Sequence, residues 1–229
     1  MRSLIATLLV TAAACGGSES PPDWPEGSYC VLRAGSCPRA ANGDFVQGTI
    51  VIDTDNEGAD ISAAEGEVGS STPGATEELA RLQLCCGAFG PSELDFPADH
   101  FALPAGGNQF EPACPDAFVE GEVFIDAEDD SLGEDADTRL EGQTGGAAIT
   151  DAGNLSLLTC ESTPDLAGEV MPEGHYCVFG GDDGVCPAGM DEGLYVTDDE
   201  DSGNTDMLTG EVGGITQSDS TTFFPFCCQ

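Results

Sequence analysis

Three short acidic stretches carry the residue types best suited to chemistry in this chain. They read DTDNEG at Asp53 to Gly58, DAEDDS at Asp126 to Ser131 and DDEDSG at Asp198 to Gly203. Because Ca²⁺ takes roughly six to eight oxygen ligands, carboxylates at close intervals are typical of a calcium-binding loop. The candidate ligands are Asp53, Asp55, Asn56, Asp126, Glu128, Asp129, Asp198, Glu200 and Asp201.

These stretches do not match an EF-hand. The twelfth positions of the three loops are Ala64, Asp137 and Thr209, where an EF-hand places a bidentate Glu. The loops also follow strand-like rather than helical segments. Two interpretations stay open: weak, extracellular-type calcium binding, or solvated acidic turns in an acidic protein.

Motifs for catalysis are missing. The chain has no G-x-S-x-G, no H-E-x-x-H and no Gly-rich phosphate loop. Because the chain has 43 acidic residues, a pair of carboxylates is weak evidence for a hydrolase. His100 and His175 share the position that Ser28 has in a repeat described below, and we interpret all three as polar residues ahead of a strand. The sequence therefore predicts a protein that is not an enzyme, and a secreted hydrolase is the least favoured alternative.

The charge balance restricts the partners. The formal net charge is −38, and all five basic residues are Arg. Such a surface repels nucleic acid and anionic lipid headgroups, so neither is an expected partner. It favours solubility or the binding of cations.

The first residues resemble an export signal. Arg2 precedes an apolar run from Leu4 to Ala14, too short for a spanning helix of about 20 residues. Ala12 to Ala14 directly before Cys15 resemble a bacterial lipobox. We expect a signal peptide at residues 1–14, a covalent lipid on Cys15 and a flexible tether over 15–23. The predicted location is exported and membrane-anchored, at the outer membrane or cell surface; the alternative is an ordinary cleaved signal.

The rest of the chain repeats one unit three times. Pro25, Pro97 and Pro172 begin the copies, 72 and 75 residues apart by subtraction (97 − 25 and 172 − 97). Further anchors recur in the same order: a Cys-Pro pair, a Gly five residues before an Asp, a GEVG or GQTG segment, and an apolar run into Cys. The predicted units are unit 1 (residues 24–93), unit 2 (94–165) and unit 3 (166–229).

Short segments rich in β-branched and aromatic residues predict strands. They are SYCVL, TIVID, EVFID, HYCVF and LYVTD, each bounded by Gly or Pro. The best helical candidate, Gly74 to Leu84, occurs in one copy only. We therefore expect an all-β, disulfide-rich protein of three repeated small β units with long acidic loops.

The cysteines agree with this repeat. Eleven cysteines less Cys15 leave ten, which in an exported chain indicates about five disulfides. Unit 2 has two cysteines because Ala102 stands where Cys30 stands in unit 1. The repeat predicts bridges within units, and adjacent cysteines of a strand point to opposite faces. The order at each Cys-Cys pair stays open; the simplest set is Cys37–Cys85, Cys30–Cys86, Cys114–Cys160, Cys186–Cys227 and Cys177–Cys228.

The same residues resemble a known family. WPEGSYCVLRAGSCP, an acidic loop after a strand, a Cys-Cys ending, and then FALPAGGNQFEPAC with EVFIDAEDD, are similar to the ApeC domain, named for the C-terminal region of apextrin. The ApeC pattern has two halves. Residues 24 to about 161 resemble one whole domain, and unit 3 resembles a further first half.

The resemblance implies extracellular matrix attachment or recognition of microbial cell-wall components. We therefore expect a surface-anchored binding or adhesion lipoprotein that recognises glycan, peptidoglycan or matrix polymer, assisted by Ca²⁺. The alternative is a structural, cation-binding envelope lipoprotein without a specific ligand. Either protein would contact the membrane through its lipid anchor only.

Overall fold

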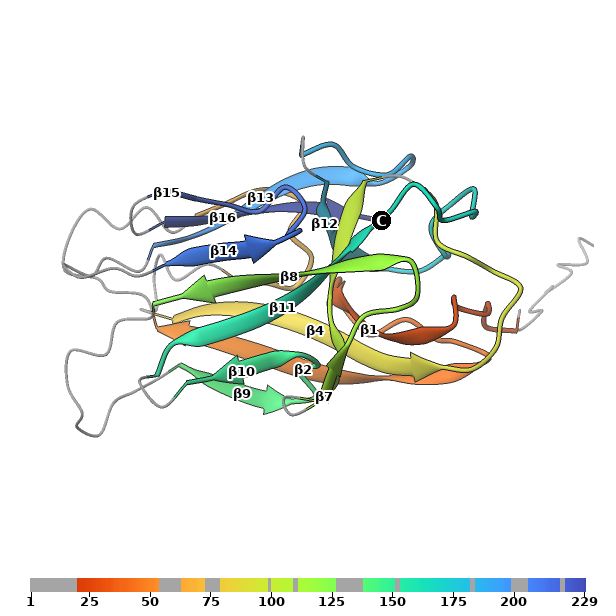
Figure 1. Ribbon diagram of the computed structural model, residues 1–229, viewed down its shortest axis with the longest axis horizontal. Coiled ribbons are helices and arrows are strands. Elements are labelled where there is room, and N and C mark those ends of the chain that lie inside the picture. Colours follow the sequence, from red (N-terminus) through yellow and green to blue (C-terminus); the bar gives the residue numbers. More distant parts are fainter. Residues whose placement is uncertain are drawn as a thin grey trace, which may run out of the picture.

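The computed structural model consists of strands joined by loops (Figure 1). It describes residues 20–53, 63–72, 79–98, 100–108, 111–126, 138–150, 153–181, 184–198, 206–218 and 221–229. No helix occurs among these residues, and none of them forms a helical segment long and apolar enough to cross a membrane. The all-β prediction is confirmed. Residues 79–84 of the helical candidate belong to a strand.

The strands divide among the three units as follows. Those of unit 1 are β1 (Gly27–Arg33), β2 (Gly43–Asp53), β3 (Ala63–Gly66) and β4 (Leu79–Phe89). Those of unit 2 are β5 (Phe101–Pro104), β6 (Gly106–Asn108), β7 (Glu111–Ala113), β8 (Phe118–Ile125), β9 (Arg139–Gly142), β10 (Ala147–Ile149) and β11 (Leu155–Ser162). Those of unit 3 are β12 (Tyr176–Gly180), β13 (Asp191–Asp198), β14 (Met207–Gly210), β15 (Thr216–Ser218) and β16 (Thr221–Cys228).

Three antiparallel ladders of four strands make up most of the molecule. Their orders are β1-β4-β2-β9, β5-β11-β8-β14 and β12-β16-β13-β3. In each ladder the last strand comes from a different unit than the other three. Since β9, β14 and β3 each pair in the ladder of a neighbouring unit, no unit completes its own ladder.

The first strands of the units join the ladders into one sheet of 14 strands. Leu32 of β1 lies opposite Cys177 of β12, and Phe179 of β12 lies opposite Ala102 of β5. The remaining contact, between units 1 and 2, is an isolated antiparallel bridge between Tyr29 and Ala105. The three contacts have the same register when residues are counted from the first cysteine position of each unit, which is Cys30, Ala102 or Cys177. The units are therefore related by an approximate threefold arrangement.

Glycine is required where a donated strand crosses its neighbour. Gly48 lies opposite Gly142, Gly121 opposite Gly210, and Gly193 opposite Gly66. A Cβ on the first member of each pair would lie only 1.9 or 2.0 Å from a carbonyl oxygen of the donated segment, closer than real Cβ atoms approach. The second members, Gly142, Gly210 and Gly66, have φ of +73°, +69° and +68°, a region that favours glycine. These contacts explain two anchors of the sequence repeat.

The ladders enclose a shared apolar core. One cluster draws residues from all three ladders, among them Ile50, Val123 and Phe226, each without exposed surface. A second cluster packs aromatic residues of the unit openings, including Trp24 and Tyr176, whose ring centroids lie 4.9 Å apart. Burial of this apolar surface is the main favourable contribution to folding.

Five disulfides close within the units. The pairs are Cys30–Cys86, Cys37–Cys85, Cys114–Cys160, Cys177–Cys228 and Cys186–Cys227. They are the pairs of the simplest set. Cys30–Cys86 and Cys177–Cys228 join residues directly opposite each other on neighbouring strands and belong to the first core cluster. We call these two the inner disulfides.

Candidate functional site

One strand of each ladder runs toward the same end of the molecule. β2, β8 and β13 all point to the left in Figure 1, and each leads into one of the acidic stretches. Ile52 and Ile125, which directly precede Asp53 and Asp126, belong to the same core cluster. The fold therefore brings Asp53, Asp126 and Asp198 to a common end, although about 70 residues separate them in sequence. We call it the acidic end.

Side chains of the donated strands hold two of these positions. The backbone N–H of Asp53 donates to the hydroxyl of Thr138, which directly precedes β9, over 2.9 Å. The N–H of Asp126 donates to a carboxylate oxygen of Asp206, which directly precedes β14, over 2.7 Å. Each loop is thus tied at its base to a neighbouring unit, and this limits where the loop can begin and end.

Asp198 differs from the other two in burial. It lies opposite Thr221 in the β13–β16 ladder and is only 2% exposed, whereas Asp53 and Asp126 are half-buried. A rigid sheet edge that holds loops of fixed length is the usual scaffold for recognition surfaces. The arrangement places the first residue of each acidic stretch, Asp53, Asp126 and Asp198, at the same end.

The calcium hypothesis stays a prediction. Among the described residues no group of three or more His, Cys, Asp or Glu side chains is arranged to hold a metal ion. Six of the nine candidate ligands lie outside the described residues: Asp55, Asn56, Glu128, Asp129, Glu200 and Asp201. Cys15 and the first residues of its tether also lie outside them, so the lipid anchor is likewise untested.

The opening motif of the units is structural. In unit 1 the hydroxyl of Tyr29 donates to the carbonyl of Pro25 over 3.0 Å, and in unit 3 Tyr176 donates to Pro172 over 2.7 Å. Burial raises the pKa of both tyrosines well above the ordinary value. These hydroxyls therefore act as neutral donors that close a turn, and the sequence P-x-G-x-Y marks a folding element.

A cavity that sequence reasoning missed lies where β5 and β11 of unit 2 meet the segment after β14. It measures about 210 Å³, and Glu161 and Glu211 both line it. Glu161 is paired with Ala102, as Cys86 is paired with Cys30. The signal was available, because Glu161 directly follows Cys160 where units 1 and 3 have a second cysteine.

The family comparison agrees with this architecture. The model of the ApeC family, described as the C-terminal domain of apextrin, matches residues 96–229, more than half of the chain. The chain belongs to the ApeC family. No curated protein and no solved structure matches it.

The ApeC match differs in position from the prediction. We expected the two-half domain at residues 24 to about 161, but the match covers units 2 and 3. The physical reason is the threefold arrangement: two successive units have the same order of strands and glycines wherever the pair begins. ApeC membership and five disulfides are consistent with an exported or extracellular protein.

Proposed function

We propose that this protein is a surface-anchored extracellular lipoprotein that binds glycan, cell-wall or matrix material through its acidic end. The observation that carries the proposal is the convergence of β2, β8 and β13, which places Asp53, Asp126 and Asp198 at one end. Three loops on a rigid, disulfide-tied scaffold are suited to contact a large ligand at several points.

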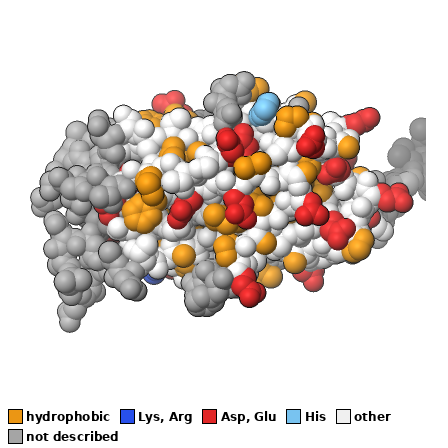
Figure 2. Space-filling view, in the orientation of Figure 1, with side chains coloured by type: hydrophobic (Ala, Val, Ile, Leu, Met, Phe, Trp, Pro, Cys, Tyr) orange, Lys and Arg blue, Asp and Glu red, His pale blue; other side chains and the backbone are white. Residues whose placement is uncertain are grey.

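Charge and anchoring support a role outside the cell. Figure 2 shows acidic side chains spread over the visible face of the molecule, with very little basic surface. A net charge of −38 disfavours contact with anionic lipid headgroups, so we assign membrane attachment to a lipid on Cys15 alone. The tether at residues 15–23 would hold the ladders away from that membrane.

In this proposal calcium bridges the acidic loops and the ligand. Carboxylates repel most anionic polymers, and a divalent cation held by the loops would allow acidic or hydroxyl-rich ligands to bind. Binding is then lost when EDTA removes the cation. The alternative is a structural lipoprotein whose acidic surface holds cations without a specific ligand.

A sedimentation assay tests the proposal. Mature protein is mixed with insoluble peptidoglycan, chitin or matrix polymer, with calcium and with EDTA. Calcium-dependent sedimentation that weakens in a D53N/D126N double variant supports binding at the acidic end. An E93Q variant, altered at an exposed acid outside the three loops, is the matched control. Absence of sedimentation with every polymer at every calcium level contradicts the proposal and favours the structural alternative.

A further inference from the structure

The ladder β1-β4-β2-β9 has one face turned away from the shared core. In β4, Leu82 belongs to the first core cluster, so its neighbours Arg81 and Gln83 lie on the opposite face. In β2, Ile50 belongs to the same cluster, and Thr49 therefore also lies on the opposite face. We call this surface the outer face of the first ladder.

Arginines gather on this outer face. The chain has five arginines and no lysine against 43 acidic residues. Of the four arginines in the described part of the chain, Arg33, Arg81 and Arg139 belong to this ladder. Arg81 and Arg139 pair with Val51 of β2 from its two sides, and the core contact of Leu140 turns Arg139 outward. A protein of net charge −38 thus concentrates its few cations on one face.

The other two ladders have no arginine in the equivalent row. In the first ladder the row is Arg81, Val51 and Arg139. The equivalent rows are Ser156, Phe124 and Met207 in the second ladder, and Phe223, Val196 and Ala63 in the third. Because the same scaffold is built with hydroxyl, aromatic and aliphatic side chains at these positions, the fold itself does not require the arginines.

Amides rather than carboxylates hold Arg33. Its Nη1 donates to Gln47 Oε1 over 2.9 Å, and its Nη2 donates to Gln83 Oε1 over 2.7 Å. The hydroxyl of Thr49 also donates to Gln83 Oε1, over 3.1 Å. The Nε of Arg33 is buried and has no hydrogen-bond partner in the described structure. Both amide oxygens are therefore occupied, and what the amides still offer is their N–H donors.

Arg33 and Arg81 are neighbours of like charge. Leu32 lies opposite Leu84, so Arg33 stands beside Gln83 and diagonal to Arg81. Diagonal positions of a sheet are about 7–8 Å apart, close enough for two positive charges to repel each other. Neither arginine forms an ion pair with a carboxylate of the described residues. The two guanidiniums thus lie side by side without a counter-charge, although acidic residues are abundant in this chain.

These donors define the chemistry of a ligand. Guanidinium groups bind carboxylates through paired hydrogen bonds, and amide N–H groups beside them suit the oxygens of hydroxyl groups. A densely charged polyanion is repelled by the net charge of −38, so the ligand carries an isolated anionic group. Val51 has no exposed surface and offers a protein partner no apolar anchor. Arg139 already pairs with Glu141 over 2.9 Å, which leaves Arg33 and Arg81 for the anion.

We propose that the outer face of the first ladder binds a saccharide that carries a carboxylate, as a uronic acid does. The guanidiniums of Arg33 and Arg81 bind the carboxylate. The amides of Gln47 and Gln83 and the hydroxyl of Thr49 bind neighbouring hydroxyl groups of the sugar. Binding needs no calcium, because the anion meets cationic side chains of the protein directly.

This site is separate from the acidic end. Asp53 is the last residue of β2, and Thr49 precedes it by four positions, which is roughly 13 Å along a strand. The outer-face site uses neither the acidic loops nor a divalent cation. It therefore does not rest on the function proposed above, and binding in EDTA distinguishes the two.

An NMR titration of the full mature chain in EDTA at low salt tests the proposal. The probe is methyl β-D-glucuronide, and the backbone amides of Thr49 and Gln83 are the reporters. We expect saturable shifts with a millimolar Kd, because so small a probe makes few contacts. Methyl β-D-glucoside, which has the same ring without the carboxylate, should bind at least tenfold more weakly. Equal binding of the two sugars overturns the proposal.

Two further probes distinguish a sugar from other carboxylates. Acetate tests for a site that takes any anion, and Nα-acetyl-aspartate methylamide represents an acidic residue of a partner protein. Each should bind at least fivefold more weakly than the glucuronide, because neither presents a ring of hydroxyl groups to the amides. Equal or tighter binding of either probe overturns the assignment to a saccharide.

Variants assign the site to its arginines. Arg33→Gln and Arg81→Gln should each weaken binding of the glucuronide at least fivefold. Arg39→Gln is the matched control, since Arg39 is an exposed arginine in the connection between β1 and β2, and it should bind like the parent. If Arg33→Gln folds poorly, Arg81→Gln decides alone. Unchanged affinity in Arg81→Gln, or equal weakening in Arg39→Gln through net charge alone, overturns the proposal.

Discussion

Units 1 and 2 have the same strand order but differ in what lies beside the first strand. In unit 1 the inner disulfide Cys30–Cys86 and the hairpin β6–β7 fill the space beside the first strand. In unit 2 the equivalent space has a carboxylate, Glu161, and a cavity. The difference shows that the threefold scaffold tolerates loss of one inner bridge, because the remaining bridges and the exchanged strands still hold each ladder.

Removing an inner disulfide should have the largest effect. The double variant Cys30→Ser/Cys86→Ser is expected to lose about 2–5 kcal/mol of unfolding free energy, since the bridge closes a long loop of the unfolded chain. Guanidinium denaturation measures this loss.

The converse variant, Ala102→Cys/Glu161→Cys, sharpens the comparison. The two residues lie directly opposite each other, as the bridged pairs do. A sixth disulfide should form and raise the denaturation midpoint. Failure of this bridge to form would show that unit 2 departs from the other units in backbone as well as in side chain.

Replacing a glycine where a donated strand crosses its neighbour should have the next largest effect. Gly121→Ala would place a Cβ about 2 Å from the Glu211 carbonyl oxygen, so β14 must shift from β8. We expect a loss of about 1–3 kcal/mol, typical of overpacking. Gly90→Ala is the control, because its nearest contact to an added Cβ is 3.7 Å. Similar thermal shifts for both variants would refute the close approach.

Alkaline pH should affect units 1 and 3 but not unit 2. Burial raises the pKa of Tyr29 and Tyr176, whereas unit 2 has Phe101 at this position. A tyrosine with a raised folded-state pKa contributes stability that is complete below its unfolded-state pKa of about 10 and is lost as pH rises above it. Melting temperature should therefore fall above about pH 10.

Tyr29→Phe isolates this effect. The variant should be slightly less stable at neutral pH, by about 1 kcal/mol for the lost hydrogen bond to Pro25. It should also lose less stability than the parent between neutral and alkaline pH. An unchanged alkaline decrease would assign the effect to other groups, among them Tyr195, whose pKa burial also raises.

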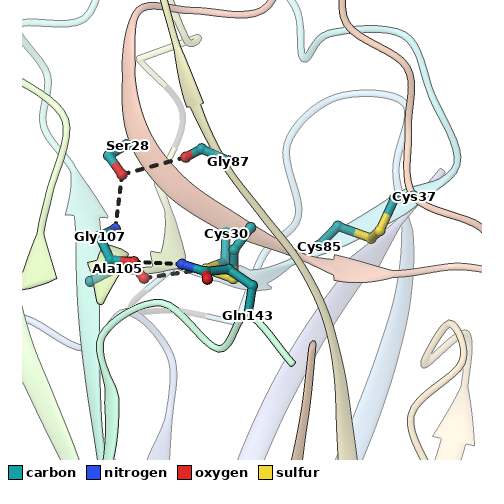
Figure 3. Close-up of a disulfide and its surroundings, with 9 residues drawn as sticks. Ser28, Cys30, Cys37, Cys85, Gly87, Ala105, Gly107 and Gln143 are labelled. Carbon is teal, nitrogen blue, oxygen red and sulfur yellow. Dashed lines mark hydrogen bonds between the residues drawn. A yellow bond between two sulfur atoms is a disulfide. The ribbon is translucent and has the colours of Figure 1, made fainter. Parts of the chain in front are cut away.

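The hydrogen bond from Gln143 to the Gly107 carbonyl should show the smallest effect (Figure 3). Gln143→Ala removes one hydrogen bond to the Gly107 carbonyl, which costs about 0.5–1.5 kcal/mol. Glu211→Ala, at the same position of unit 2, should leave stability almost unchanged, since Glu211 is exposed. Hydrogen exchange of the Gly107 amide measures the first variant locally. Equal stability losses in both variants would contradict the difference between Gln143 and Glu211.

Much of the unit could be predicted from local sequence. Strand segments such as TIVID follow from residue types, and bridges within units follow from alignment of the copies. The order at each Cys-Cys pair was decided only by the structure. The exchange of β3, β9 and β14 could not be predicted, because a strand of four residues does not encode which edge it pairs with. The family match covers residues 96–229 rather than the expected first pair of units for a related reason: copies that are alike in sequence do not mark where a pair of them begins.

The sequence by itself determined the all-β class, disulfides that close within units and the family resemblance. These depend on periodicity, cysteine register and glycine positions, all of which are local properties of the chain. Only the tertiary structure decided that Asp53, Asp126 and Asp198 meet at one end and that Glu161 and Glu211 line one cavity. Both results require strands from different units to lie side by side, and such pairing depends on the packing of the whole core.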